Sequence, residues 1–111
     1  MVKKVSKKVA KEIKDYVALL KKDKLPIEKV ILFGSYAKGT EHKWSDIDLC
    51  VISPKFKNSW QALNYLWQKR EKNFGLTIEP IGFSPKDFKD EDSLIHEIKR
   101  TGIEIKLKQL N

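Results

Sequence analysis

Residues 30–52 read VILFGSYAKGTEHKWSDIDLCVI, and this stretch decides the fold. Residues 29–33 form an apolar run rich in β-branched side chains that stops at Gly34, a pattern that predicts a buried strand. Residues 46–52 predict a second strand, because acidic and apolar residues alternate in its first part and its second part is continuously apolar. Residues 35–38, which lie between them, can form a short helix that Gly39 closes.

Helices and strands alternate on both sides of this stretch. Upstream, apolar residues recur at steps of three and four with lysines between them, which predicts an amphipathic helix that ends at Leu25-Pro26. The apolar stripe consists of Val2, Val5, Val9, Ile13, Tyr16, Val17 and Leu20. Downstream, we expect a helix capped by Ser59 and closed by Gly75, and a strand over 76–83 that Pro80 places near an edge or a strand end. A last helix, capped by Ser93 and ended by Gly102, precedes a half-buried strand over 103–107.

This order of elements predicts an α/β (α+β) fold, in which a mixed β-sheet of about four strands is flanked by helices. The 111 residues suit a single domain over 1–111. No apolar stretch approaches the roughly 18 residues of a membrane span, and the N-terminus lacks the apolar core of a signal peptide. Cys50 is the only cysteine and sits in an apolar run, as expected of a buried thiol in a reducing compartment. We therefore expect a cytoplasmic protein with no membrane partner.

Two carboxylates follow the Gly34-Ser35 pair at a fixed spacing of ten residues. On a strand, residues two apart point to the same face, so Asp46 and Asp48 are expected to project side by side. Two adjacent carboxylates repel each other, and a divalent cation such as Mg²⁺ removes that repulsion. Gly34 lets the backbone approach a ligand closely, and the serine hydroxyl and helix amides beside it favour a phosphate. The pattern predicts a metal-dependent site for a nucleoside triphosphate.

The motifs Gly34-Ser35-Tyr36-Ala37-Lys38-Gly39 and Ser45-Asp46-Ile47-Asp48-Leu49 resemble those of the nucleotidyltransferases typified by DNA polymerase β. Among these, the chain is most similar to the minimal nucleotidyltransferases of bacteria and archaea. Two later stretches, 77–80 and 97–102, resemble the same family more weakly. The resemblance implies the polymerase β-like fold and transfer of a nucleoside monophosphate from a triphosphate, with ATP as the expected substrate, to a hydroxyl.

The resemblance also implies roles for individual residues. Gly34 and Ser35 would hold the terminal phosphates, and Asp46 and Asp48 would hold two Mg²⁺ ions that clamp an in-line displacement. A third carboxylate would share the second metal and help to deprotonate the attacking hydroxyl. We assign this role to Glu79, on the third predicted strand, and keep Asp87 as a weaker candidate.

Two residues depart from the family's pattern, and each leaves an alternative open. The family more often has aspartate at the position of Glu79, whose other interpretation is a salt bridge to a lysine. It commonly has arginine at the position of Lys38, which can meet a phosphate as a point charge or be a solvated helix lysine. Trp44 could stack on a base or cover a strand end, while Trp60 and Trp67 are expected in the core or at an interface.

The net charge of +8 is uneven, since residues 1–24 hold nine lysines against three acidic residues. Such a basic helix is either a solvated face or a site that attracts an acidic partner. The resemblance implies a HEPN-type helical toxin as that partner, with this chain as the antitoxin that adenylylates it. An antitoxin that neutralises its partner by binding alone is the alternative. A nucleic-acid-binding domain is a weaker hypothesis, because the basic helix alone suggests it.

Overall fold

The computed structural model describes residues 5–42, 45–70, 77–89 and 92–106. Its elements are α1 (Lys7–Lys22), β1 (Lys29–Phe33), α2 (Ser35–Lys38), β2 (Ile47–Ile52), α3 (Ser59–Gln68), β3 (Ile78–Phe83), η1 (Asp87–Lys89), α4 (Ser93–Thr101) and β4 (Ile103–Ile105). The predicted alternation of helices and strands is confirmed. The sequence did not predict the 3-10 turn η1 between β3 and α4.

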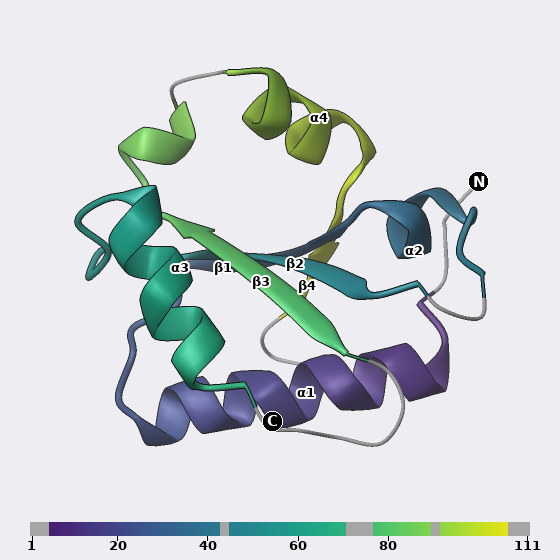
Figure 1. Cartoon of the computed structure of the whole chain (residues 1–111), viewed down its shortest axis with the longest axis horizontal. Coiled ribbons are helices and arrows are strands. Elements are labelled where there is room, and N and C mark those ends of the chain that lie inside the picture. The colour runs from purple at the N-terminus through teal and green to yellow at the C-terminus, as the bar shows by residue number, and fades with distance from the viewer. Residues whose placement is uncertain (1–4, 43–44, 71–76, 90–91, 107–111) are drawn as a thin grey trace.

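The four strands form one mixed sheet in the order β3-β2-β1-β4 (Figure 1). β1 is antiparallel to both β2 and β4, whereas β2 and β3 are parallel and are joined through α3. β3 is therefore an edge strand, which explains how it accommodates Pro80 without losing a hydrogen bond inside the sheet. The predicted mixed sheet of four strands is confirmed.

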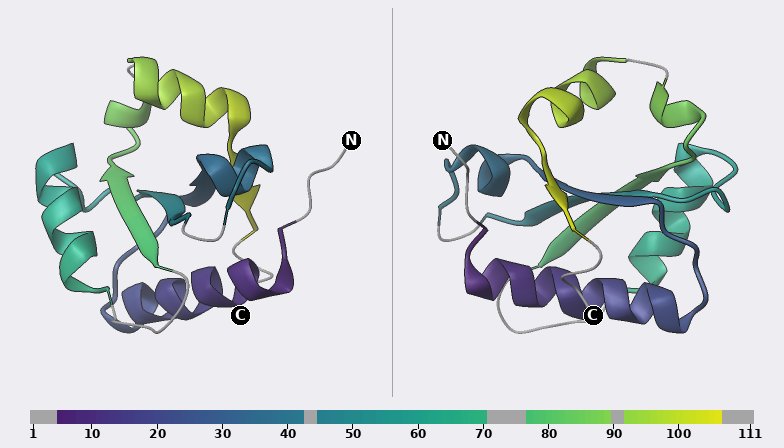
Figure 2. Two further views of the ribbon diagram at one scale, coloured as in Figure 1. Left: turned by 45° about the vertical axis from the view of Figure 1, so that its right-hand side comes forward. Right: turned by 180° about the vertical axis from the view of Figure 1, so that it is seen from behind.

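Helices cover both faces of the sheet. Figures 1 and 2 show α1 and α3 against one face, and η1 and α4 against the other. Alternate side chains of β1 point to opposite faces of the sheet. Val30 and Leu32 pack in the core with α1, while Ile31 packs with α4. The same alternation in β2 sends Ile47 towards α1. Its neighbour Asp48 consequently points to the α4 side, the side on which the candidate site is built.

The long helix α1 is fixed by its cap and by its apolar stripe. The Ser6 hydroxyl accepts a hydrogen bond from the amide of Val9 at 3.2 Å, which satisfies one amide of the first turn. The stripe is buried as predicted from Val9 to Leu20, while Val2 lies outside the described residues. The Tyr16 hydroxyl donates to the carbonyl of Leu66 at 2.7 Å and so ties α1 to α3.

The predicted helix caps at Ser59 and Ser93 were each wrong by one residue. The N-cap of α3 is Asn58, whose side chain accepts from the amide of Gln61 at 2.7 Å. The N-cap of α4 is Asp92, whose carboxylate accepts from the amide of Ile95 at 2.8 Å. Asparagine and aspartate cap at least as well as serine, so the residue before each serine takes the role. Gly75 lies outside the described residues.

Gly102 and Cys50 complete the description of the packing. Gly102 ends α4 as predicted, and a Cβ there would lie 2.6 Å from Ile31 Cγ2, so the close approach of α4 to β1 needs glycine. Cys50 is fully buried as predicted, and burial raises the pKa of its thiol to about 12. In the described ranges, no helix combines the length and apolarity that crossing a bilayer requires.

Candidate active site

Gly34 brings the end of β1 against a carboxylate of β2. It follows β1 with φ 74° and ψ −152°, a conformation that residues other than glycine rarely adopt. A Cβ at this position would lie 2.0 Å from Asp48 Oδ2. The sheet register causes this proximity, because Phe33 pairs with Asp48 across the two strands. The predicted close approach at Gly34 is thus made by the protein's own carboxylate.

The turn after Gly34 is a single turn of helix. The amides of Ala37 and Lys38 both donate to the carbonyl of Gly34 at 3.1 Å, and Gly39 closes the turn with φ 76°. A four-residue helix has little macrodipole, so an anion here would be held by nearby amides and the Ser35 hydroxyl rather than by the helix as a whole. Ser35 is half-buried at the first position of this turn.

Asp48 and Glu79 face each other across the parallel pair of strands. The register of β2 and β3 places Asp48 opposite Glu79, and both are half-buried. Their neighbours Ile47 and Ile78 are buried in the core on the α1 side. Asp46 lies just before β2 rather than within it. The next residue, Ile47, begins the strand and donates its amide to the carbonyl of Thr77 at 2.8 Å. The structure therefore brings all three predicted carboxylates to one end of the sheet.

These carboxylates interact electrostatically. Burial raises the pKa of Asp48, the charge of Asp46 raises it further, and hydrogen bonding with Glu79 lowers it. Burial also raises the pKa of Glu79, as do a hydrogen bond with Asp46 and the charges of both aspartates. The charge of Asp46 thus disfavours the ionised forms of both Asp48 and Glu79, as a neighbouring carboxylate does in the absence of a compensating cation.

The donor set suits Mg²⁺, which prefers carboxylate oxygen and is bound by few protein ligands. The mutual repulsion of the three groups is the condition that a divalent cation relieves. Within the described ranges, no three histidine, cysteine or acidic side chains are already arranged to hold a metal ion. The residue types fit the metal, and the half-buried carboxylates would have to reorient to ligate it.

Lys38 is held by a residue far away in the sequence. Its ammonium forms an ion pair of 2.7 Å with Glu97 Oε1 on α4, and each side chain is partly exposed. This pair lowers the pKa of Glu97. The predicted role of Lys38 at the phosphates therefore requires the ammonium to leave Glu97 or to be shared with it.

Removing this competitor should strengthen nucleotide binding. In the Glu97→Gln variant, the Lys38 ammonium keeps a neutral hydrogen-bonding neighbour but loses its ionic one, and we expect the affinity for ATP with Mg²⁺ to rise a few-fold by calorimetry. Glu104→Gln is the matched control, since Glu104 is an exposed residue of β4 that forms an ion pair with Lys29 in the same way. An unchanged ATP affinity in Glu97→Gln would return Lys38 to the role of a surface ion-pair residue.

The sequence can now be placed among known proteins. The family model described as nucleotidyltransferase domain matches residues 6–107. The chain belongs to this nucleotidyltransferase family. A proposed protein adenylyltransferase of Methanocaldococcus jannaschii is 32% identical over 100 residues, which cover 87% of this chain and 95% of the relative. A second such protein of that organism is 35% identical over 82 residues, covering 67% of this chain and 78% of the relative.

Solved structures share the fold of this nucleotidyltransferase. A proposed nucleotidyltransferase from Sulfolobus solfataricus has a TM-score of 0.64 at 19% identity, covering 87% of this chain and 78% of that one. A toxin–antitoxin structure with AMP-PNP has a TM-score of 0.53 at 19% identity, covering 82% of this chain and 70% of that one. At this level of identity the likeness concerns the fold, and it confirms the fold class predicted from the sequence.

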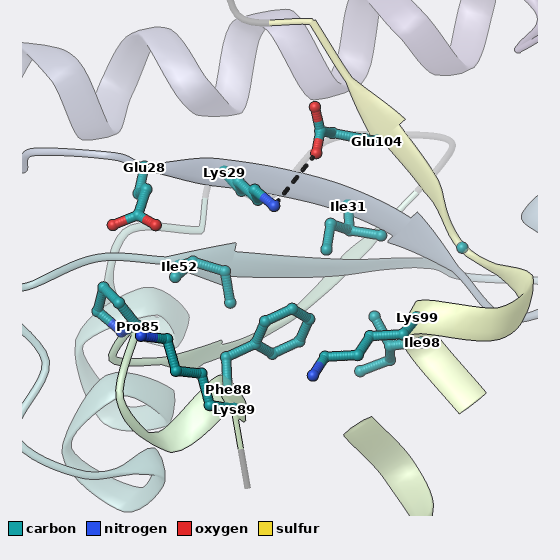
Figure 3. Close-up of a pocket in the computed structure, with 11 residues that line it drawn as sticks. Glu28, Lys29, Ile31, Ile52, Pro85, Phe88, Lys89, Ile98, Lys99 and Glu104 are labelled. Carbon is teal, nitrogen blue, oxygen red and sulfur yellow. Dashed lines mark ion pairs between the residues drawn. The ribbon is translucent and has the colours of Figure 1, made fainter. Parts of the chain in front are cut away.

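A pocket of about 620 Å³ lies elsewhere on the nucleotidyltransferase (Figure 3). Ile31, Ile52 and Phe88 line its apolar part, and Lys29 at its rim is paired with Glu104 at 3.7 Å. None of the six predicted site residues lines it, because it lies where β1 begins and β2 ends, away from Asp48. Volume alone does not identify a catalytic site, and we assign the chemistry to the end of the sheet that carries the carboxylates.

Sequence reasoning missed one charged group at this site. Arg70, just after α3, lowers the pKa of Glu79 through its positive charge. Its guanidinium lies over the ring of Trp67, 3.9 Å from the ring centroid. No pattern in the sequence connects Arg70 with Glu79, since only the packing of α3 beside β3 brings them together. The weaker candidate Asp87 lies in η1, beyond the end of β3 that is remote from Asp48.

Proposed function

We propose that this nucleotidyltransferase transfers AMP from ATP to a hydroxyl of a partner protein in a Mg²⁺-dependent reaction, and that the partner is a HEPN-type helical toxin. The observation that carries the proposal is the contact of Gly34 with Asp48, which itself lies opposite Glu79. The relatives named as proposed protein adenylyltransferases support a protein acceptor, and the toxin–antitoxin neighbour with AMP-PNP supports the pairing with a toxin. We place the reaction in the cytoplasm, as the sequence suggests.

On the nucleotide side, Gly34 and Ser35 would bind the terminal phosphates through the backbone and the hydroxyl. Lys38 would add a positive charge once it is released from Glu97. Asp46, Asp48 and Glu79 would hold Mg²⁺, which when bound neutralises charge on the phosphates.

On the acceptor side, Glu79 would take the proton of the hydroxyl as its oxygen attacks the α-phosphorus. The bond between that phosphorus and the bridging oxygen breaks, and pyrophosphate leaves with the bonding electrons. A base must be able to ionise near neutral pH and must lie next to the reacting atoms. Arg70 favours the ionised form of Glu79 and so opposes the effects of burial and the two aspartates.

The test is transfer of label from α-³²P-ATP to a candidate HEPN-type partner in the presence of Mg²⁺. We expect Glu79→Gln to reduce the transfer rate by roughly a hundredfold to ten-thousandfold, the usual contribution of a general base, while ATP still binds. Asp87→Asn is the matched control and should transfer at the wild-type rate. Wild-type transfer by Glu79→Gln would leave Glu79 as a structural carboxylate.

The alternative is an antitoxin that neutralises its partner by contact alone. The ion pair of Lys38 with Glu97 favours it, because that pair withdraws a charge from the phosphate site. Under this alternative, wild-type protein and the Asp48→Asn variant would neutralise the partner equally well, and no label would appear on it.

A further inference from the structure

The outward face of α3 carries two exposed tryptophans. Trp60 is 71% exposed and Trp67 is 42% exposed, which excludes the core for Trp60 and leaves the predicted interface. Seven residues separate them, which is close to two helical turns, and they therefore share one side of the helix. The opposite side of α3 is buried through Ala62 and Leu66. Large aromatic side chains on the surface mark an interaction site more often than charged or small ones do.

Trp67 is fixed against β3, the edge strand that also carries Glu79. Its indole N–H donates to the carbonyl of Pro80 at 3.0 Å, and Pro80 directly follows Glu79 in β3. The guanidinium of Arg70 lies over the Trp67 ring, 3.9 Å from its centroid. A guanidinium held flat on an indole keeps its N–H groups available at the edges of the stack.

The segment that contains α3 is basic. Residues 54–70 contain Lys55, Lys57, Lys69 and Arg70 and no acidic residue. Lys69 forms an ion pair with Asp23 at 3.3 Å, whereas the guanidinium of Arg70 lies over the exposed Trp67. A partner that meets this face is therefore expected to be acidic, because complementary charges favour association and like charges oppose it.

The edge of β3 is poorly suited to adding a further strand. Pro80 has no amide hydrogen to donate, and its carbonyl already accepts from Trp67. A partner at this edge has to be recognised by side chains. Tryptophan and arginine are the side chains that most often dominate the binding energy of protein interfaces.

We propose that Trp60, Trp67 and Arg70, which we call the α3 surface, bind the acceptor protein through an acidic segment next to the hydroxyl that is modified. This inference rests on the proposed function, and it adds the docking site and the charge of the segment. Arg70 would pair with a carboxylate of the acceptor, Trp60 would cover apolar side chains, and the hydroxyl would be presented to Glu79. Arg70 is a positioning residue in this account. Its rival role is to bind the triphosphate of ATP.

The test uses the full chain, labelled with ¹⁵N, and two synthetic peptides of equal length. Each peptide carries one serine, and one is rich in glutamate while the other is rich in lysine. We expect the glutamate-rich peptide to shift the indole N–H signals of Trp60 and Trp67 in a saturable manner, and the lysine-rich peptide to leave them unchanged. Trp60→Ala should weaken the binding about tenfold, as the loss of an interface anchor does.

Charge reversal decides the role of Arg70. Arg70→Glu should reverse the preference between the two peptides, whatever its effect on ATP binding through Glu79. Lys86→Glu, which makes the same charge change in the turn after β3, should keep the glutamate preference. An unchanged preference in Arg70→Glu overturns the inference. Failure of the wild type to bind ATP would instead contradict the proposed function. The peptide experiment would still show whether the α3 surface binds an acidic segment.

Discussion

The Asp48→Asn variant should lose nucleotide transfer by more than about a hundredfold, because it removes the central carboxylate of the proposed metal site. Asparagine preserves the shape of the side chain, so the contact with Gly34 and the register with Glu79 persist. We expect calorimetry to show that ATP with Mg²⁺ binds far more weakly to the variant. The matched control is Asp15→Asn, which neutralises an exposed carboxylate on α1 that pairs with Lys11.

The stability of this variant distinguishes loss of function from loss of fold. Folding raises the pKa of Asp48, chiefly through burial, so its ionised form is disfavoured in the folded state above the unfolded pKa. Asparagine removes that penalty at neutral pH. The free energy of unfolding in metal-free buffer should therefore stay the same or rise, as measured by urea denaturation. A variant that unfolds more easily and binds ATP as well as wild type would show that Asp48 serves the fold.

The sequence predicted the order of elements and singled out the three candidate carboxylates for identifiable reasons. The stripe of α1 and the buried strands β1 and β2 are periodic, and periodicity follows from local geometry. Asp46 and Asp48 are two residues apart in the sequence, so their proximity needs no knowledge of the fold. Glu79 could be chosen because an acidic residue in an apolar strand requires an explanation. Its place opposite Asp48 was settled by the parallel register of β2 and β3.

Other features depend on contacts between distant segments, which the sequence does not express. Lys38 and Glu97 are 59 residues apart in the chain, and their ion pair arises where α2 lies near α4. Trp60 was expected in the core or at an interface, and only the packing of α3 decides between the two, since the helix buries Ala62 and Leu66 and leaves Trp60 exposed. Trp44, considered as a base-stacking residue, lies outside the described residues, so its role stays a prediction.

Glycine at position 34 is predicted to be essential for the geometry of Asp48. In Gly34→Ala, the new methyl group would lie 2.0 Å from Asp48 Oδ2, well inside van der Waals contact, so the carboxylate has to move. A displacement of about 1 Å at a reacting site can cost about a hundredfold in rate, and we expect at least that loss of AMP transfer. Backbone strain adds a loss of stability of about 1–3 kcal/mol, which urea denaturation would report.

Gly39→Ala separates the displaced carboxylate from backbone strain. Gly39 also has a positive φ, of 76°, but a Cβ there has no neighbour within 4 Å. Its left-handed conformation costs alanine about 1–2 kcal/mol, so the variant should lose stability while keeping ATP affinity and transfer near wild type. If both alanine variants lost transfer equally, the integrity of the α2 turn would explain the effect. The two substitutions add the same methyl group to the same turn. If only Gly34→Ala lost transfer, the loss would therefore be due to the displaced Asp48 carboxylate.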